Sequence, residues 1–248
     1  MLKKMIYQPI RPFPTTQPVA YKLNDSVVSK LWGWKPLSSI MYVVPWIRSK
    51  VTKLDINERI IEVPFVFRQI NWKKAPKVLD VGSSESTVSL SLASLGCEVT
   101  AVDLRRYPLK HPNLKPRKGD IVILDLPSNS FDYVVCLSTL EHIGLPTMYG
   151  TVGEKTTDRT ALKAMVDALK KGGKLVLTTP VAAKYSESSF QRVYTPKKLQ
   201  SLLKSLKIDE ISYYAPNLLH DQWEEVSEEE LPTGPHFGVA AVVARKKS

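Results

Sequence analysis

Short apolar runs alternate with amphipathic segments from Lys77 to the end of the chain. The apolar runs lie at 78–81, 98–103, 131–137 and 174–179. Between them, apolar positions recur with helical spacing over Ser84–Leu95 and over Arg159–Lys171, which leads into a Gly-Gly pair. Nearly continuous apolar strands separated by helices are typical of a parallel sheet covered on both faces. We therefore predict an α/β fold with a doubly wound sheet.

The C-terminal part of the chain predicts one more helix and two more strands. Thr195 and Pro196 are the residue types of an N-cap and a first helical position, so we expect a helix from there through Leu206. The apolar runs Ile211–Tyr214 and Gly238–Ala244 follow as two late strands. We expect these two strands to form an antiparallel edge of the sheet.

The N-terminal segment has a different texture. Four prolines within the first 18 residues exclude a long helix, and three of the five tryptophans lie between positions 32 and 46. We favour packing of these aromatic residues on the main domain over an interfacial anchor or a substrate lid. A helical pattern runs from Asp55 to Ile70, with Pro64 expected to kink or break it. We divide the chain into a basic N-terminal extension or lid, residues 1–54, and a domain, residues 55–248.

Positive charge is concentrated near the N-terminus. The formal net charge of the chain is +11, and residues 1–75 supply +9 of it with 13 basic and 4 acidic side chains. Residues 76–248 are nearly balanced, with 22 basic and 20 acidic side chains. Such asymmetry indicates an anionic partner, for example a phosphate-bearing substrate, a nucleic acid or a membrane surface. An ordinary contribution to solubility explains it equally well.

The sequence predicts neither export nor membrane insertion. The longest nearly apolar run, Ser39–Ile47, is much shorter than the roughly 20 residues that span a bilayer. The N-terminus lacks the apolar core of a signal peptide. Cys97 and Cys136 each lie in an apolar stretch, which predicts two buried, reduced thiols, and the Cys/His spacing indicates no metal site. We expect a soluble, cytoplasmic protein with no transmembrane segment and no bound metal.

Candidate ligand-binding residues stand at the ends of the predicted strands. Gly82 follows the first strand, where glycine permits a tight turn and a close backbone approach to a ligand. Asp103 ends the second strand, 21 residues beyond Gly82, and is placed to accept hydrogen bonds from a ribose diol. Asp120 ends a third strand and could accept a hydrogen bond from an exocyclic amine. Together these residues predict an adenosine-bearing ligand with little or no phosphate.

An ordered set of short motifs resembles the class I S-adenosylmethionine-dependent methyltransferases. The motifs are Val78–Gly82, Ala101–Leu104, Gly119–Ile121, Leu126–Val135, Leu140–Gly144 and Lys171–Leu175. They are most similar to the small-molecule branch, which includes enzymes of ubiquinone biosynthesis and of sugar tailoring. The resemblance implies a Rossmann-like, doubly wound, mostly parallel seven-stranded sheet with an antiparallel C-terminal edge. It also implies S-adenosyl-L-methionine as the cofactor and S-adenosyl-L-homocysteine as the product.

The resemblance also assigns cofactor-binding roles to residues of this sequence. In the family, the first motif is usually Asp-x-Gly-x-Gly-x-Gly, whereas the later glycines are serines here, at positions 84 and 86. A Cβ at these positions could crowd the turn and the path of the methionine moiety. The residues expected to contact the cofactor, from its methionine end to its adenine, are Asp80, Gly82, Ser84, Ser86, Leu137, Ser138, Asp103, Leu104, Asp120 and Ile121.

Methyl transfer to a hydroxyl group requires alignment of the nucleophile and removal of a proton. His142 is the best candidate base, because it follows the fourth strand and imidazole titrates near neutral pH. Glu141 could orient the imidazole or take the proton itself, and a purely structural role for His142 is the alternative. Arg105, Tyr149 and His236 are candidate substrate contacts.

The leading hypothesis is a methyltransferase that O-methylates a small molecule, such as a sugar or a glycan precursor, with an anionic acceptor as one option. One alternative is an RNA methyltransferase that uses the basic N-terminal segment to hold phosphates. A second alternative is a methyltransferase-like binding protein without turnover, which the serines at positions 84 and 86 suggest.

Overall fold

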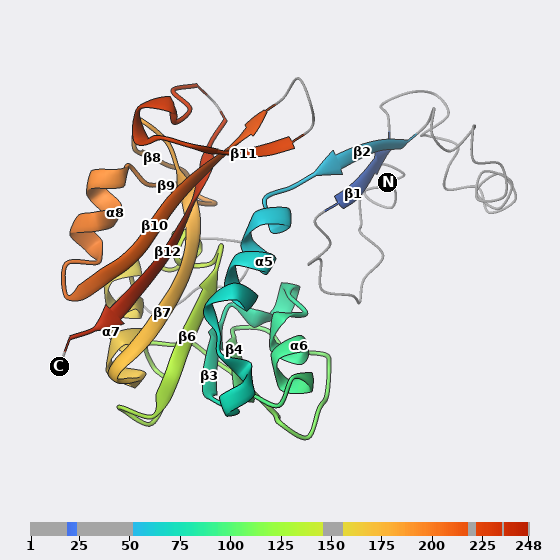
Figure 1. Cartoon of the computed structure of the whole chain (residues 1–248), viewed down its shortest axis with the longest axis vertical. Helices are drawn as coiled ribbons and strands as arrows, with labels where there is room; N and C mark the ends of the chain where they lie inside the picture. The colour runs from blue at the N-terminus through green and yellow to red at the C-terminus, as the bar shows by residue number, and fades with distance from the viewer. Residues whose placement is uncertain (1–18, 24–51, 146–155, 218–221, 235, 248) are drawn as a thin grey trace, which may run out of the picture.

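The computed structural model describes residues 19–23, 52–145, 156–217, 222–234 and 236–247. Its centre is an eight-stranded mixed sheet with the strand order β11-β10-β12-β7-β6-β3-β4-β5 (Figure 1). The predicted doubly wound α/β fold is confirmed, and the sheet has one strand more than the seven expected. Most of the N-terminal extension, at 1–18 and 24–51, lies outside the described residues.

Five neighbouring strands form the parallel part of the sheet. β3 (Lys77–Val81) pairs with β4 (Glu98–Asp103) on one side and with β6 (Phe131–Leu137) on the other. β5 (Leu114–Lys118) extends the sheet beyond β4, and β7 (Leu169–Val181) extends it beyond β6. The chain therefore winds outward from β3 to β5 and then in the opposite direction from β6. Such a reversal opens a crevice at the carboxyl ends of the two central strands.

The C-terminal strands form the antiparallel edge that the sequence predicts. β12 (Gly238–Lys246) inserts between β7 and β10 (Leu206–Asn217) and pairs antiparallel with both. β11 (Gln222–Val226) is the additional, outermost strand. Its sequence is acidic and mostly exposed, so it lacks the apolar pattern from which a strand can be predicted.

Within the described residues, four α-helices accompany the sheet: α5 (Arg59–Gln69), α6 (Val88–Ser94), α7 (Asp158–Ala168) and α8 (Pro196–Leu202). The predicted N-cap of α8 is confirmed, because the Thr195 side chain accepts a hydrogen bond from the Lys198 amide at 3.2 Å. α7 ends at Ala168, earlier than predicted, since β7 already begins at Leu169 and pairs there with Phe131. α8 likewise ends at Leu202, and β10 begins at Leu206.

Two other predicted helix boundaries also differ from the structure. α5 begins at Arg59 rather than Asp55, because β2 (Thr52–Ile56) pairs with β1 (Val19–Leu23). Pro64 lies inside α5 without ending it. The helix expected from Ser84 is a 3-10 turn, η2 (Ser83–Glu85), followed by α6. The remaining short elements are η1 (Trp72–Lys74), η3 (Leu140–His142), β8 (Ser186–Glu187), β9 (Arg192–Val193) and η4 (Glu228–Glu230).

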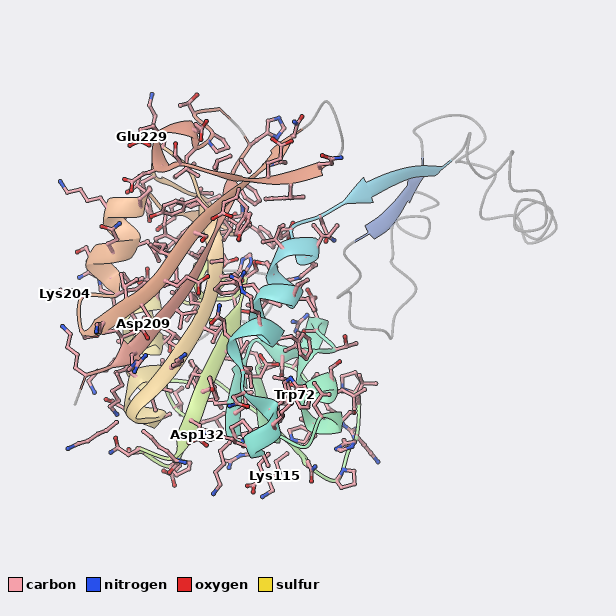
Figure 2. All side chains as sticks on the ribbon, in the orientation of Figure 1. Trp72, Lys115, Asp132, Lys204, Asp209 and Glu229 are labelled. Carbon is pink, nitrogen blue, oxygen red and sulfur yellow. The ribbon has the colours of Figure 1, made fainter. Side chains whose placement is uncertain are left out.

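Two apolar clusters cover the two faces of the sheet. One packs α7 and α8 on the strands and includes Met165, Leu199 and Leu177. The other packs α5 and α6 on the opposite face and includes Val66 and Leu92. Helices on both faces explain why the central strands are almost continuously apolar. Charged side chains lie at the periphery, as Figure 2 shows for the exposed residues Lys115, Lys204 and Glu229.

The structure also bears on the expectations for the cysteines, for membrane-spanning helices and for metal sites. Cys97 and Cys136 are buried and free, as predicted. No helix within the described residues has the length and apolar character needed to cross a membrane. In the same part of the chain, no three His, Cys, Asp or Glu side chains are grouped so that they could hold a metal ion.

Replacing Leu177 with alanine tests the packing of the central strands. The Leu177 side chain is fully buried in β7, between the helices and the sheet. We expect Leu177→Ala to lower the free energy of unfolding by about 2–5 kcal/mol, because it leaves a cavity in a close-packed core. Urea denaturation measures this change. Ile123→Ala is the control, since Ile123 is 72% exposed, and equal effects of the two substitutions would contradict the packing described here.

Candidate active site

A cavity that opens to solvent lies at the carboxyl ends of β3, β4 and β6, and its empty space together with the open solvent at its mouth is about 830 Å³. It coincides with the winding reversal of the sheet, where open α/β folds bind their ligands. The structure brings most of the predicted site residues together around this cavity, namely Gly82, Ser86, Asp103, Leu104, Arg105, Asp120, Ile121, Leu137, Ser138 and His142. Tyr149 lies outside the described residues.

The turn after β3 requires glycine at position 82. Gly82 has φ = +83°, and a Cβ there would overlap the Thr139 side chain, which packs against the turn from the end of β6. The Gly82 amide donates a hydrogen bond to the Val102 carbonyl at 2.8 Å. The turn is therefore held between β4 and β6, with its backbone at the cavity wall.

Serine fits at positions 84 and 86 without backbone strain. Ser84 lies within η2, and Ser86 has φ = −130°, so neither residue adopts a left-handed conformation. The Ser86 hydroxyl accepts a hydrogen bond from the Val88 amide at 3.0 Å, at the start of α6. The Ser84 amide donates to Asp103 at 3.0 Å, whereas its side chain does not line the cavity. Serine at these two positions is therefore compatible with an intact turn.

Asp103 is fixed at the edge of the cavity. One carboxylate oxygen accepts the hydrogen bond from the Ser84 amide, and the other accepts from the Arg105 amide at 2.8 Å and from its Nε at 3.2 Å. Arg105 also forms an ion pair with Glu85 at 2.6 Å. A carboxylate offers about four acceptor positions, so Asp103 can also accept a ligand hydroxyl. Arg105, predicted to contact substrate, lies beside Asp103 on the same wall.

Asp120 and Ile121 lie after β5 in the same cavity. Asp120 accepts hydrogen bonds from the Val122 amide at 2.9 Å and from the Thr156 hydroxyl at 2.7 Å. Its strand end is tied to that of β4, because the Gly119 amide donates to the Asp103 carbonyl at 2.8 Å. The Asp120 carboxylate and the apolar Ile121 side chain therefore line the same cavity as Asp103 at the end of β4.

Asp80 lies behind the glycine turn and does not line the cavity. Asp80 is 2% exposed, and its carboxyl group accepts a hydrogen bond from the Ser89 hydroxyl at 2.6 Å. Burial raises the pKa of Asp80 to about 6. The role that the structure shows for Asp80 is therefore to join β3 to α6 beneath the turn.

A second, more polar hollow adjoins the cavity and shares four of its lining residues: Arg59, Glu85, Ser138 and His142. Its other walls come from distant segments and include Phe190, Gln191 and Phe237. His236, a predicted substrate contact, is exposed and lines neither hollow, although the adjacent Phe237 does. Phe237 could be expected near the pocket from its place before the last strand, whereas Arg59 and Phe190 carry no local motif that could have identified them from the sequence.

His142 stands at the boundary between the two hollows. Its Nδ1 lies 2.7 Å from the Phe190 carbonyl oxygen, and its ring packs edge-on against the Phe190 ring at 4.7 Å. Burial lowers the pKa of His142, which favours the neutral imidazole at pH 7. A carbonyl oxygen can only accept, so Nδ1 carries the proton of the neutral ring. His142 Nε2 is then the nitrogen with the basic lone pair.

Glu141 is an almost completely buried acid beside this imidazole. It is 1% exposed, and its Oε1 lies 3.8 Å from His142 Nε2. Burial raises the pKa of Glu141 to about 8, and the negative charge of Glu62 adds to the shift. The Thr179 hydroxyl donates to its carboxyl group at 3.2 Å. Glu141 is therefore mostly uncharged at neutral pH.

The raised pKa of Glu141 predicts a pH-dependent stability. Between its ordinary pKa of 4.5 and its folded pKa of about 8, the folded state binds more protons than the unfolded state, so stability falls as pH rises. Glutamine cannot ionise, so we expect Glu141→Gln to be more stable than wild type at pH 9, by on the order of 2 kcal/mol. The difference should shrink toward pH 5 in urea denaturation series. Glu229→Gln, at an exposed position, is the control, and a pH-independent difference for Glu141→Gln would refute the assignment.

Comparisons with known proteins agree with this geometry. Residues 79–177 match the family model described as a methyltransferase domain. A mitochondrial ubiquinone biosynthesis O-methyltransferase of Schizosaccharomyces pombe is 29% identical over 160 residues, covering 60% of this chain and 50% of that protein. The ubiquinone biosynthesis O-methyltransferase of Idiomarina loihiensis is 34% identical over 129 residues, covering 48% of each chain. This chain thus spans about half the length of the curated relatives it matches.

Solved structures share the fold at low sequence identity. A S-adenosylmethionine-dependent methyltransferase from Methanosarcina mazei aligns with a TM-score of 0.53 and 18% identity, covering 74% of this chain and 97% of that one. The 1,6-didemethyltoxoflavin-N1-methyltransferase of Burkholderia thailandensis, solved with bound 1,6-didemethyltoxoflavin and S-adenosylhomocysteine, aligns with a TM-score of 0.54 and 17% identity, covering 75% of this chain and 77% of that one. Residues 79–177 therefore match a methyltransferase domain in sequence, and the chain shares its fold with solved S-adenosylmethionine-dependent methyltransferases.

Proposed function

We propose that this protein binds S-adenosylmethionine in the cavity at the winding reversal and catalyses O-methylation of a small molecule. The observation that carries the proposal is the placement of Asp103 and Asp120 beside the Gly82 turn, in one cavity. In this arrangement Asp103 accepts a hydrogen bond from a ribose hydroxyl, and Asp120 with Ile121 holds the adenine. The relatives with similar sequences are named O-methyltransferases, which supports oxygen as the acceptor atom.

The methionine end of the cofactor fits the opposite wall of the cavity. Leu137 ends β6 there and Ser138 follows it, and Arg59 lines the same cavity from α5. The Arg59 guanidinium suits a carboxylate, since it presents several donors in a planar fork. When bound, the cofactor supplies an electrophilic methyl group on a sulfonium. The task of the protein is then to align an acceptor and remove its proton.

His142 is the proposed proton acceptor. Its Nε2 carries the lone pair in the neutral ring, and the side chain lies where the cavity meets the second hollow. An acceptor hydroxyl in the second hollow would therefore lie between His142 and the methyl group. Glu141 beside His142 is mostly neutral. A permanently charged carboxylate would favour the protonated imidazolium, so the neutral Glu141 leaves the imidazole able to take the proton.

The second hollow supports a polyhydroxylated acceptor, such as a sugar or a glycan precursor. Asn57, Glu58 and Gln191 line it with groups that can hydrogen-bond to hydroxyls. Phe190 and Phe237 add aromatic surface for the less polar face of a sugar ring. We further propose that residues 1–54 act as an extension of the domain at 55–248, because β2 leads directly into α5, which contributes Arg59 to both hollows.

Replacing Asp103 with alanine tests the cofactor site. We expect wild-type protein to bind S-adenosylmethionine with micromolar affinity and Asp103→Ala to bind it at least tenfold more weakly, because a charge-assisted hydrogen bond to the ribose is lost. Isothermal titration calorimetry measures both, with thermal melts to confirm folding. Asp125→Ala, at an exposed position outside the cavity, is the matched control. An unchanged affinity of Asp103→Ala would show that the cofactor site is assigned wrongly.

Replacing His142 with glutamine tests the role of the base. Formation of S-adenosylhomocysteine would be followed with a panel of sugar and phenolic acceptors from pH 6 to 9. We expect His142→Gln to reduce kcat at least a hundredfold with the acceptor that wild type uses, while S-adenosylhomocysteine affinity changes by less than threefold. If kcat is retained across the pH range, positioning alone explains the reaction and His142 is not the base.

A further inference from the structure

Glu62 is a completely buried carboxylate on α5. Removing a carboxylate from water is costly unless charged or hydrogen-bonding partners compensate it. Both of its oxygens have such partners. Arg59 Nη1 pairs with Oε2 at 2.5 Å, and the Ser138 hydroxyl donates to Oε1. Each partner is itself a wall residue of the cofactor cavity.

Ser138 has an unfavourable backbone conformation that its surroundings maintain. Its φ is +38°, in the left-handed region that residues other than glycine rarely adopt. The Ser138 amide donates to the carbonyl and the hydroxyl oxygens of Thr178, both at 3.1 Å. The side-chain bond to Glu62 adds an anchor from the opposite direction. Such conformations persist where several contacts over-determine them.

The conformation of Ser138 affects the rest of the cavity through the next residue. Thr139 packs its side chain against Gly82, where a Cβ would overlap it. The Thr139 hydroxyl also donates to the Leu137 carbonyl at 2.9 Å. Contacts therefore run from Glu62 on α5, through the turn at 137–139, to the glycine turn after β3. A substitution at Glu62 should therefore alter the conformation of both turns.

Arg59 is the second wall residue that Glu62 holds. It lies one turn before Glu62 on α5, its side chain is only 14% exposed, and it lines both hollows. An arginine side chain has many rotamers, and the ion pair restricts it to the one that faces the cavity. Glu62 thus orients a cation from α5 and a hydroxyl from the end of β6 at the same end of the site.

We infer that Glu62 is a positioning residue, which docks α5 on the end of β6 and so pre-forms the methionine end of the cofactor cavity. The inference builds on the proposed function for its effect on cofactor binding. Its effect on the turn at 137–139 does not depend on that function. A purely structural ion pair would predict a change in global stability without a local change at this turn.

The test compares Glu62→Gln with Glu210→Gln. Glu210 forms the other ion pair of α5, with Arg68 at 2.7 Å, on the exposed side of the helix. Two quantities are measured on the full-length protein: the affinity for S-adenosylhomocysteine by calorimetry, and amide hydrogen exchange at 137–139 without ligand. We expect Glu62→Gln to weaken binding at least tenfold and to speed exchange at 137–139 at least tenfold, while exchange in β12 changes little. Glu210→Gln should change neither quantity.

Ser138→Ala is a second variant, because Glu62→Gln could fail to fold. It removes only the hydroxyl bond to Glu62 and should also speed exchange at 137–139. Unchanged exchange at 137–139 in a folded variant, with S-adenosylhomocysteine affinity within twofold of wild type, would overturn the inference. If wild type binds no S-adenosylhomocysteine but exchange still responds to Glu62→Gln, the proposed function fails and the positioning of the turn by Glu62 stands.

Discussion

The reversal of winding between β3 and β6 determines where this protein can bind a ligand. β4 and β5 extend the sheet in one direction and β7 in the other, so the connections after β3 and β6 diverge. A crevice remains at the carboxyl ends of these strands. Gly82 keeps it open, because a side chain there would collide with Thr139. The acidic ends of β4 and β5 then come to the same wall.

Three carboxyl-bearing residues near this crevice, Asp80, Glu141 and Glu62, are at most 2% exposed, and their partners distinguish them. Asp80 has the Ser89 hydroxyl, and burial raises its pKa to about 6. Glu141 lies deep beside His142, and burial raises its pKa to about 8. Glu62 faces the guanidinium of Arg59 instead. Asp80 is therefore a structural link, Glu141 is a mostly neutral neighbour of the imidazole, and Glu62 is a charged anchor for α5.

The departures from the glycine-rich motif become understandable at the level of the backbone. Among the residues of the turn, only Gly82 adopts a positive φ, and the serines at 84 and 86 have room for their Cβ atoms. Ser86 also satisfies an amide at the start of α6. The two serines suggested a binding protein without turnover, and their fit in an intact turn removes that argument.

Local patterns in the sequence predict the alternation of strands and helices, the glycine turn and the acids Asp103 and Asp120, because buried strands and strand ends leave such patterns. They do not predict β11, whose exposed acidic residues carry no apolar period, nor the partners of Asp80. Tertiary packing brings Arg59, Glu62 and Phe190 into contact with Ser138 and His142. The bond between Glu62 and Ser138 joins residues 76 positions apart. Such contacts depend on which strands become neighbours and how helices pack across them, and no local pattern along the chain records that outcome.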